Sequence, residues 1–242
     1  MMISKSSPKS PPTTTSYVMD AIRGGILEGR YPTDSRLDQQ AIADELGVSL
    51  VPVREGLRLL EAEGFVKVHP RRGVYVCGPD PDLVSRSLHT YLQLLDTNDV
   101  TWRLAEIRRI LEIEIAPLAA ARATPEQRIQ LRQLCQEMRT GSGSTEKLAE
   151  LDLRFHMLLA EATKNELFGV LLAPLMEQME NLFHNTWADY GARPIELVLQ
   201  HHEAVLVAVE QGDSDAARRA MTEHMEYFFL VLEESSEKNR PE

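Results

Sequence analysis

The chain has 242 residues, of which 43% are hydrophobic and 26% charged, which is typical of a globular protein and excludes disorder for most of its length. No apolar run approaches the about 20 residues that a membrane-spanning helix needs, and the polar N-terminus lacks the apolar core of a secretory signal. We therefore expect a cytoplasmic protein with no membrane partner. Its two cysteines, Cys77 and Cys135, are too few for a disulfide framework or a paired zinc motif.

The formal net charge of −11 is unevenly distributed along the chain. Residues 1–80 carry ten basic and ten acidic side chains, so the whole excess of negative charge lies in residues 81–242. An acidic surface repels a polyanion such as DNA, whereas a surface without net charge does not. Two halves of different charge indicate two domains with different tasks.

The N-terminal half begins with a segment rich in Ser, Thr, Pro and Lys, which predicts a disordered tail over residues 1–15. Three short helical patterns and two alternating patterns follow it. The helices are expected from Ser16 to a stop at Gly29, over residues 38–46, and from an N-cap at Ser49 to about Glu63; the strands are expected over residues 65–69 and 74–77. Two prolines in residues 79–82 mark a linker.

Two short helices joined by a turn and followed by a basic hairpin indicate a winged helix-turn-helix, in which the second helix enters the major groove of DNA. Gly47 gives the turn its backbone freedom. Arg54 and Arg58 share one helix face and can reach phosphate or guanine, while Arg71 and Arg72 at the hairpin tip suit backbone or minor-groove contact. On spacing alone, solvated charges on a small structural domain remain an alternative.

Residues 37–76 resemble the N-terminal domain of GntR-type bacterial transcription regulators, through Leu-Gly-Val-Ser at 46–49, Pro-Val-Arg-Glu at 52–55 and Arg-Arg-Gly at 71–73. The resemblance covers about residues 18–77 and implies a double-stranded DNA operator as partner. The DNA-binding residues expected on this basis are Gln40, Ser49, Leu50, Val51, Arg54, Arg58, His69, Arg71, Arg72 and Gly73.

The sequence departs from the family pattern at the start of the third helix. The family usually has Arg and then a small polar residue where this chain has Leu50 and Val51. Neither side chain can form a bidentate pair with guanine, so we expect an unusual operator, with apolar contact to a thymine methyl as a substitute. Gly56 replaces the usual Ala, at a cost of about 1 kcal/mol in helix propensity.

Everything after Asp82 has helical periodicity, with no convincing strand. The expected segments are 82–96, 99–123, 125–139, 145–163, 166–190, 195–211 and 214–235. The predicted fold is therefore mostly α, with a winged helix-turn-helix domain over 16–78, a linker over 79–82, an antiparallel bundle of six or seven helices over 83–236, and a tail over 237–242.

Four side chains of this half can converge. Asp152 and His156 lie at i, i+4 on one helix face. His202 and His224 lie ten and eleven residues on either side of the Gly212-Asp213 turn, which places them at about the same height, about 15–17 Å from it, in an antiparallel helix pair. Both histidines fall on apolar stripes.

One inward histidine is more often a hydrogen-bonded core residue than a ligand. Three of them with an aspartate would each need a polar partner, and one divalent metal supplies all of them. Zinc is our first choice, with nickel, manganese or iron as alternatives. His201 is the alternative to its neighbour His202 as the third ligand.

Residues 83–235 resemble the FCD effector domain that many GntR-type regulators carry, a domain named for the FadR carboxy-terminal domain. Its metal-binding members share Asp-x-x-x-His followed by two histidines 22 residues apart, which Asp152, His156, His202 and His224 match. The resemblance implies a bound metal and a small carboxylate effector that modulates operator binding.

Arg108 stands where this family has an arginine, so the resemblance implies a charge-assisted pair between Arg108 and the effector. A surface salt bridge with Glu112 at i+4 is the alternative for Arg108. His184 and Trp187 are candidates for the pocket lining, with an interfacial or core role as their alternative.

We therefore predict a ligand-responsive transcription regulator, acting as a repressor, and not an enzyme. We expect a homodimer on a palindromic operator, since a two-fold dimer doubles the DNA contacts of one small DNA-binding domain. Two other functions fit the same ligand set. One is a sensor that responds to the metal alone. The other is a helical metalloenzyme, although no Glu-x-x-His occurs in residues 145–235 and no base or nucleophile pairs with the ligands.

Overall fold

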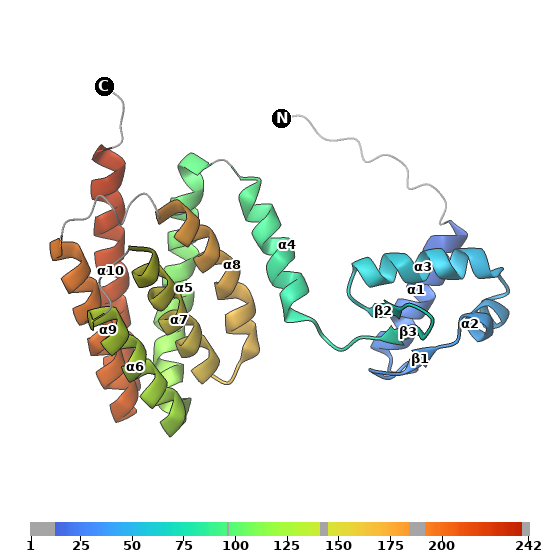
Figure 1. Cartoon of the computed structure of the whole chain (residues 1–242), viewed down its shortest axis with the longest axis horizontal. Coiled ribbons are helices and arrows are strands. Elements are labelled where there is room, and N and C mark those ends of the chain that lie inside the picture. Colours follow the sequence, from blue (N-terminus) through green and yellow to red (C-terminus); the bar gives the residue numbers. More distant parts are fainter. Residues whose placement is uncertain (1–12, 96, 141–144, 184–191, 239–242) are drawn as a thin grey trace. The chain divides into compact units, whose positions relative to one another are not determined.

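The structure is a computed structural model and describes residues 13–95, 97–140, 145–183 and 192–238. The chain divides into two compact units, one ending at Leu83 and the other beginning at Val84. Helices make up most of the described residues, and the strands described all lie in the N-terminal unit (Figure 1). The prediction of a mostly α fold is confirmed.

The N-terminal unit contains three helices and a three-stranded antiparallel sheet. Its elements are α1 (Thr14–Leu27), β1 (Arg36–Leu37), α2 (Gln39–Leu46), α3 (Leu50–Ala62), β2 (Val66–His69) and β3 (Gly73–Val76). Strand β3 lies between the other two, and its pairing with β2 closes the predicted hairpin at His69 and Gly73. The buried core is formed by Val18, Ile22, Leu37, Ile42, Ala43, Val53, Leu57, Leu60, Val66, Val74 and Val76.

Local sequence explains the helix-turn-helix. The Asp38 carboxylate accepts hydrogen bonds from the backbone N–H groups of Gln40 and Ala41, which caps α2. Gly47 ends α2 with a φ of +66°, in the left-handed region that glycine adopts without strain. Ser49 stands at the N-cap of α3 as predicted, but its side chain makes no capping hydrogen bond in the described part of the chain.

Two features of this unit differ from the sequence prediction. Helix α1 begins at Thr14, inside the segment expected to be disordered, because the Thr13 side chain caps it by accepting from the backbone N–H of Ser16. Strand β1 was not predicted, since two residues are too few to show an alternating pattern. Its Leu37 is nevertheless buried in the core.

The C-terminal unit is a bundle whose described residues form seven helices. They are α4 (Pro81–Gln93), α5 (Thr97–Arg122), α6 (Pro125–Thr140), α7 (Thr145–Ala162), α8 (Glu166–Phe183), α9 (Ala192–Gln211) and α10 (Ser214–Lys238). Helix α5 is central and packs against α7, α8, α9 and α10 (Figure 1). No described helix has the combination of length and apolar character that crossing a membrane requires.

One predicted helical segment is shorter in the structure, since the segment 82–96 ends as a helix at Gln93. The segment 166–190 is helical up to Phe183, the last described residue before a gap. Residues 184–191, which include His184 and Trp187, lie outside the described residues, so the expected roles of those two side chains stay predictions.

Candidate functional site

The candidate DNA-reading surface is formed by the start of α3 and the β2–β3 hairpin, which we call the wing. Ser49 is exposed at the N-cap of α3. Leu50 is half-buried and packs against the core of the unit, whereas the Val51 side chain is 75% exposed. Of the two apolar residues at the start of α3, Val51 is therefore the one exposed on this surface.

Polar side chains of α2 and α3 extend this surface. Arg54 and Arg58 are exposed one turn apart on α3. Arg54 Nε donates to Gln39 Oε1 at 3.4 Å, and Arg58 Nη1 lies 4.0 Å from a Glu55 carboxylate oxygen, so neither guanidinium is held tightly. Gln40 is exposed on α2, where its amide makes an intrahelical hydrogen bond.

The wing presents two exposed arginines at its tip. Arg71 adopts a φ of +62°, an uncommon conformation for a residue with a side chain, and Arg72 follows it. Gly73 has a φ of +109°, and a Cβ there would lie 2.8 Å from Arg36 Nε, so Gly73 serves the turn itself. His69 is half-buried, with its ring edge-on to the tyrosine ring of β3 at 5.5 Å between centroids.

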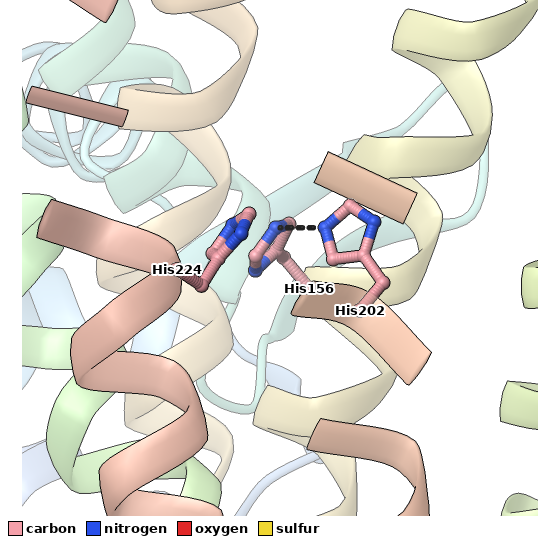
Figure 2. Close-up of side chains that lie close together, drawn as sticks. All are labelled: His156, His202 and His224. Atoms are coloured by element: carbon pink, nitrogen blue, oxygen red, sulfur yellow. Dashed lines mark hydrogen bonds between the residues drawn. The ribbon is translucent and has the colours of Figure 1, made fainter. Parts of the chain in front are cut away.

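The C-terminal unit brings the four predicted metal ligands together from three helices. Asp152 and His156 lie on α7, His202 on α9 and His224 on α10, and the three imidazoles face one another (Figure 2). Each histidine offers a nitrogen, and these nitrogens all lie within 4.8 Å of one another. The three rings are no more than 3% exposed. His201 lies outside this cluster and packs edge-on against Tyr227.

The distances between three of these donor atoms suit a shared cation. His202 Nε2 lies 3.2 Å from Asp152 Oδ1 and 3.3 Å from His156 Nε2, and His156 Nε2 lies 3.7 Å from the same aspartate oxygen. Ligand atoms about 2.1 Å from one ion lie about 3.0–3.4 Å from one another in tetrahedral or octahedral sites. The donor set of one carboxylate and three imidazoles therefore fits a divalent transition metal.

Several buried nitrogens of this cluster lack an ordinary hydrogen-bond partner. Among the described residues, nothing pairs with His202 Nδ1 or with either ring nitrogen of His224. Buried polar groups without partners are rare in native proteins, because each carries the cost of its lost hydration. His224 carries this observation, which is independent of the distances: a cation ligated by its ring would pair with one of its two nitrogens, whereas His202 Nδ1 would stay unpaired because His202 Nε2 is the atom near the other donors.

Two oppositely charged side chains of α5 border the cluster. Arg108 is 4% exposed, and Arg108 Nη2 lies 3.0 Å from His156 Nε2 and 3.9 Å from Asp152 Oδ2. Glu112 is 1% exposed, and its two oxygens contact Arg108 Nε and His156 Nδ1. The Arg108–Glu112 pair that we considered as a surface salt bridge thus forms in the interior, because both side chains face the bundle core.

At Asp152, His202 and His224 the electrostatics favour the protonation states that metal ligands need. Burial alone raises the pKa of Asp152, but the adjacent His156 and His202 bring that pKa well below its usual range. Burial lowers the pKa of His202 and, much further, that of His224. A carboxylate and neutral imidazoles are the forms that bind cations. Burial also lowers the pKa of His156, but Glu112 reverses that direction and raises it.

Comparison with known proteins matches both halves of the chain. Residues 14–76 match the family "Bacterial regulatory proteins, gntR family", and residues 103–227 match the FCD domain. The chain is 30% identical over 222 residues to the HTH-type transcriptional regulator LutR of Bacillus subtilis, with 88% of this chain and 99% of LutR covered. This chain belongs to the GntR family of bacterial regulatory proteins.

Two further similarities support this assignment to the GntR family. This GntR-family regulator is 29% identical to the Uxu operon regulator of Haemophilus influenzae, over 94% of this chain and 85% of that protein. The solved structure of Streptococcus agalactiae GntR matches with a TM-score of 0.64 and 26% identity, over 88% of this chain and 98% of that one. The chain is thus a transcription regulator with a DNA-binding domain and an FCD effector domain, and not an enzyme.

Sequence analysis of this GntR-family regulator missed one residue of the site. Glu112 entered only as a surface partner of Arg108, whereas the structure places its carboxylate against both Arg108 and His156. The only signal available was an acidic residue at i+4 from Arg108 among apolar neighbours of α5. That signal does not separate a buried pair from an exposed one.

Proposed function

We propose that this regulator holds a divalent metal, zinc as first choice, between Asp152, His156, His202 and His224, and that a small carboxylate bound beside it changes operator affinity. The observation that carries the proposal is the convergence of three buried histidines from three helices, with nitrogens that lack other partners. An ion that takes five or six ligands would leave room for a carboxylate oxygen beside these four side chains, and zinc can expand to five.

Arg108 is the residue that would hold the other oxygen of the acid. Arginine only donates hydrogen bonds, so its contact with His156 uses the lone pair of His156 Nε2. That lone pair serves one partner at a time. If His156 Nε2 held a metal, Arg108 Nη2 would be free to donate to an acid while Arg108 Nε stays on Glu112.

The charges at the site favour an acid with one negative charge. The charged side chains at the site are the buried Arg108 and Glu112 and the half-buried Asp152, which sum to −1. A divalent ion brings the sum to +1, and one monocarboxylate then makes the site neutral. A dicarboxylate would leave a net negative charge, and uncompensated buried charge is costly.

The test is to measure metal content and operator binding together. We expect about one equivalent of metal in purified wild-type protein and none in His156→Ala, while His201→Ala, which lies outside the cluster, keeps it. Stoichiometric metal in His156→Ala would refute the site. Operator affinity is then measured with zinc, with and without a panel of mono- and dicarboxylates. A change produced by zinc alone would favour the metal-only sensor over our proposal.

We also propose that the regulator is a homodimer that represses transcription from a palindromic operator. One DNA-binding domain, with its α3 and wing, contacts few base pairs, and two such domains related by a two-fold axis double that number. Sedimentation in the presence of operator and in vitro transcription test this. A monomer on a single half-site, or increased transcription on binding, would contradict it.

A further inference from the structure

Glu112 lies where the predicted metal ligands meet the predicted effector arginine. It is 1% exposed, and its two carboxylate oxygens face different partners: Oε1 contacts Arg108 Nε and Oε2 contacts His156 Nδ1. One carboxylate therefore joins a residue that would hold the metal and a residue that would hold the acid.

The contacts around His156 fix which nitrogen of its ring carries the proton. Arg108 Nη2 lies 3.0 Å from His156 Nε2, and a guanidinium can only donate, so Nε2 must be the unprotonated nitrogen. The proton of the neutral ring then lies on Nδ1, which faces an acceptor-only carboxylate of Glu112. Two independent neighbours thus require the same tautomer.

In this tautomer the lone pair that can bind a metal lies on His156 Nε2. His156 Nε2 lies 3.3 Å from His202 Nε2 and 3.7 Å from Asp152 Oδ1, so its lone pair faces the other donors of the cluster. A carboxylate behind a ligating histidine fixes the ring and raises its basicity, and loss of such a partner typically costs about 10–100-fold in metal affinity.

We propose that Glu112 is a positioning residue that holds the proton on His156 Nδ1 and the guanidinium of Arg108 in place, so that one carboxylate prepares both the metal site and the acid site. This inference rests on the proposed function. It adds that metal binding and acid binding both depend on Glu112 of α5, so that both weaken when Glu112 is replaced.

The test compares Glu112→Gln with Glu114→Gln. Glu114 is exposed on the same helix and pairs with Arg218, so its change to glutamine removes an equal charge without touching the cluster. We expect Glu112→Gln to weaken zinc binding about 10–100-fold and to weaken acid binding to the zinc-loaded protein, with Glu114→Gln unchanged in both. Equal zinc affinity in Glu112→Gln and wild type would overturn the proposal.

A second variant separates positioning from loss of charge balance, because Glu112→Gln removes the nearer of the two carboxylates beside Arg108. Arg108→Gln/Glu112→Gln removes both charges, and we expect its zinc affinity to stay reduced because His156 Nδ1 still lacks a carboxylate. Recovery of wild-type zinc affinity in this double variant would overturn the role of Glu112 at His156. Partial recovery in Glu112→Asp, which restores a shorter carboxylate, is the expected rescue.

The tautomer itself can be observed without metal. In histidine-labelled, chelator-treated full-length protein, nitrogen NMR is expected to show His156 protonated at Nδ1, to show that preference weakened in Glu112→Gln, where Arg108 still donates to Nε2, and to show it lost in Arg108→Gln/Glu112→Gln. A proton on Nε2 in wild type would overturn the inference. Wild-type protein that does not bind zinc would overturn the proposed function, and the ring measurement would still decide whether Glu112 holds the Nδ1 proton.

Discussion

Replacing His224 is a direct test of the site, because the substitution should raise the stability of the metal-free protein and lower that of the zinc-loaded protein relative to wild type. The His224 ring is 3% exposed, and neither nitrogen has a hydrogen-bond partner among the described residues. Burial keeps its pKa well below the usual range, so the ring is neutral. Leucine has a similar volume and no polar atoms, so His224→Leu removes the unpaired nitrogens without opening a large cavity.

The expected magnitude follows from those nitrogens. A buried polar group without a partner costs about 1–3 kcal/mol, so the chelator-treated His224→Leu protein should be more stable than wild type by about that amount. In a domain of 150–250 residues this raises the Tm by about 2–12 °C. With zinc at 1,000 times its Kd, wild type gains about 4 kcal/mol and the variant gains none, so the order of stability reverses.

The assay is thermal unfolding of wild type and His224→Leu in chelator and in excess zinc. His201→Leu is the matched control, since His201 neighbours His224 but lies outside the ligand cluster. It should keep the full zinc-dependent rise in Tm. A chelator-treated His224→Leu protein that is less stable than wild type, or one that still gains stability from zinc, would refute the reasoning.

Three further predictions concern the DNA-reading surface, the thiol of Cys135 and helix α1. Arg54→Ala should weaken operator binding by about 1–3 kcal/mol per half-site in a titration, and unchanged affinity would remove Arg54 from the interface. Burial raises the pKa of Cys135 to about 12, so at pH 8 only about one thiol in ten thousand is ionised, and iodoacetamide should modify it only after unfolding. In urea unfolding, Gly24→Ala should stabilise the N-terminal unit by up to about 1 kcal/mol, because a Cβ there meets nothing within 4 Å. The neighbouring Gly25→Ala should destabilise it by about 1–3 kcal/mol, because a Cβ there would lie 2.6 Å from the Tyr31 ring, and equal effects of the two changes would contradict the packing argument.

Much of the fold could be predicted because its determinants are local. Asp38 and Gly47 fix the two ends of α2 through a cap and a left-handed turn, and both are visible in the sequence. The hairpin is visible as two alternating runs around residues 70–73. Strand β1 is not visible, since two residues carry no period and their pairing with β3 depends on the finished fold.

The site shows the same division between periodicity and tertiary packing. The i, i+4 spacing on α7 and the equal distances of His202 and His224 from one turn place those side chains at comparable heights, which depends only on helix geometry. The burial of Arg108 and Glu112 depends instead on α5 being surrounded by four other helices. No pattern within α5 alone carries that information.

The depth at which the three imidazoles lie has a kinetic consequence. Chelators in solution cannot reach nitrogens whose rings are no more than 3% exposed, so an ion held there leaves only when α9 or α10 opens locally. The rate of metal loss should then level off as chelator concentration rises. A regulator loaded during its own synthesis would keep its ion through brief changes in cellular supply.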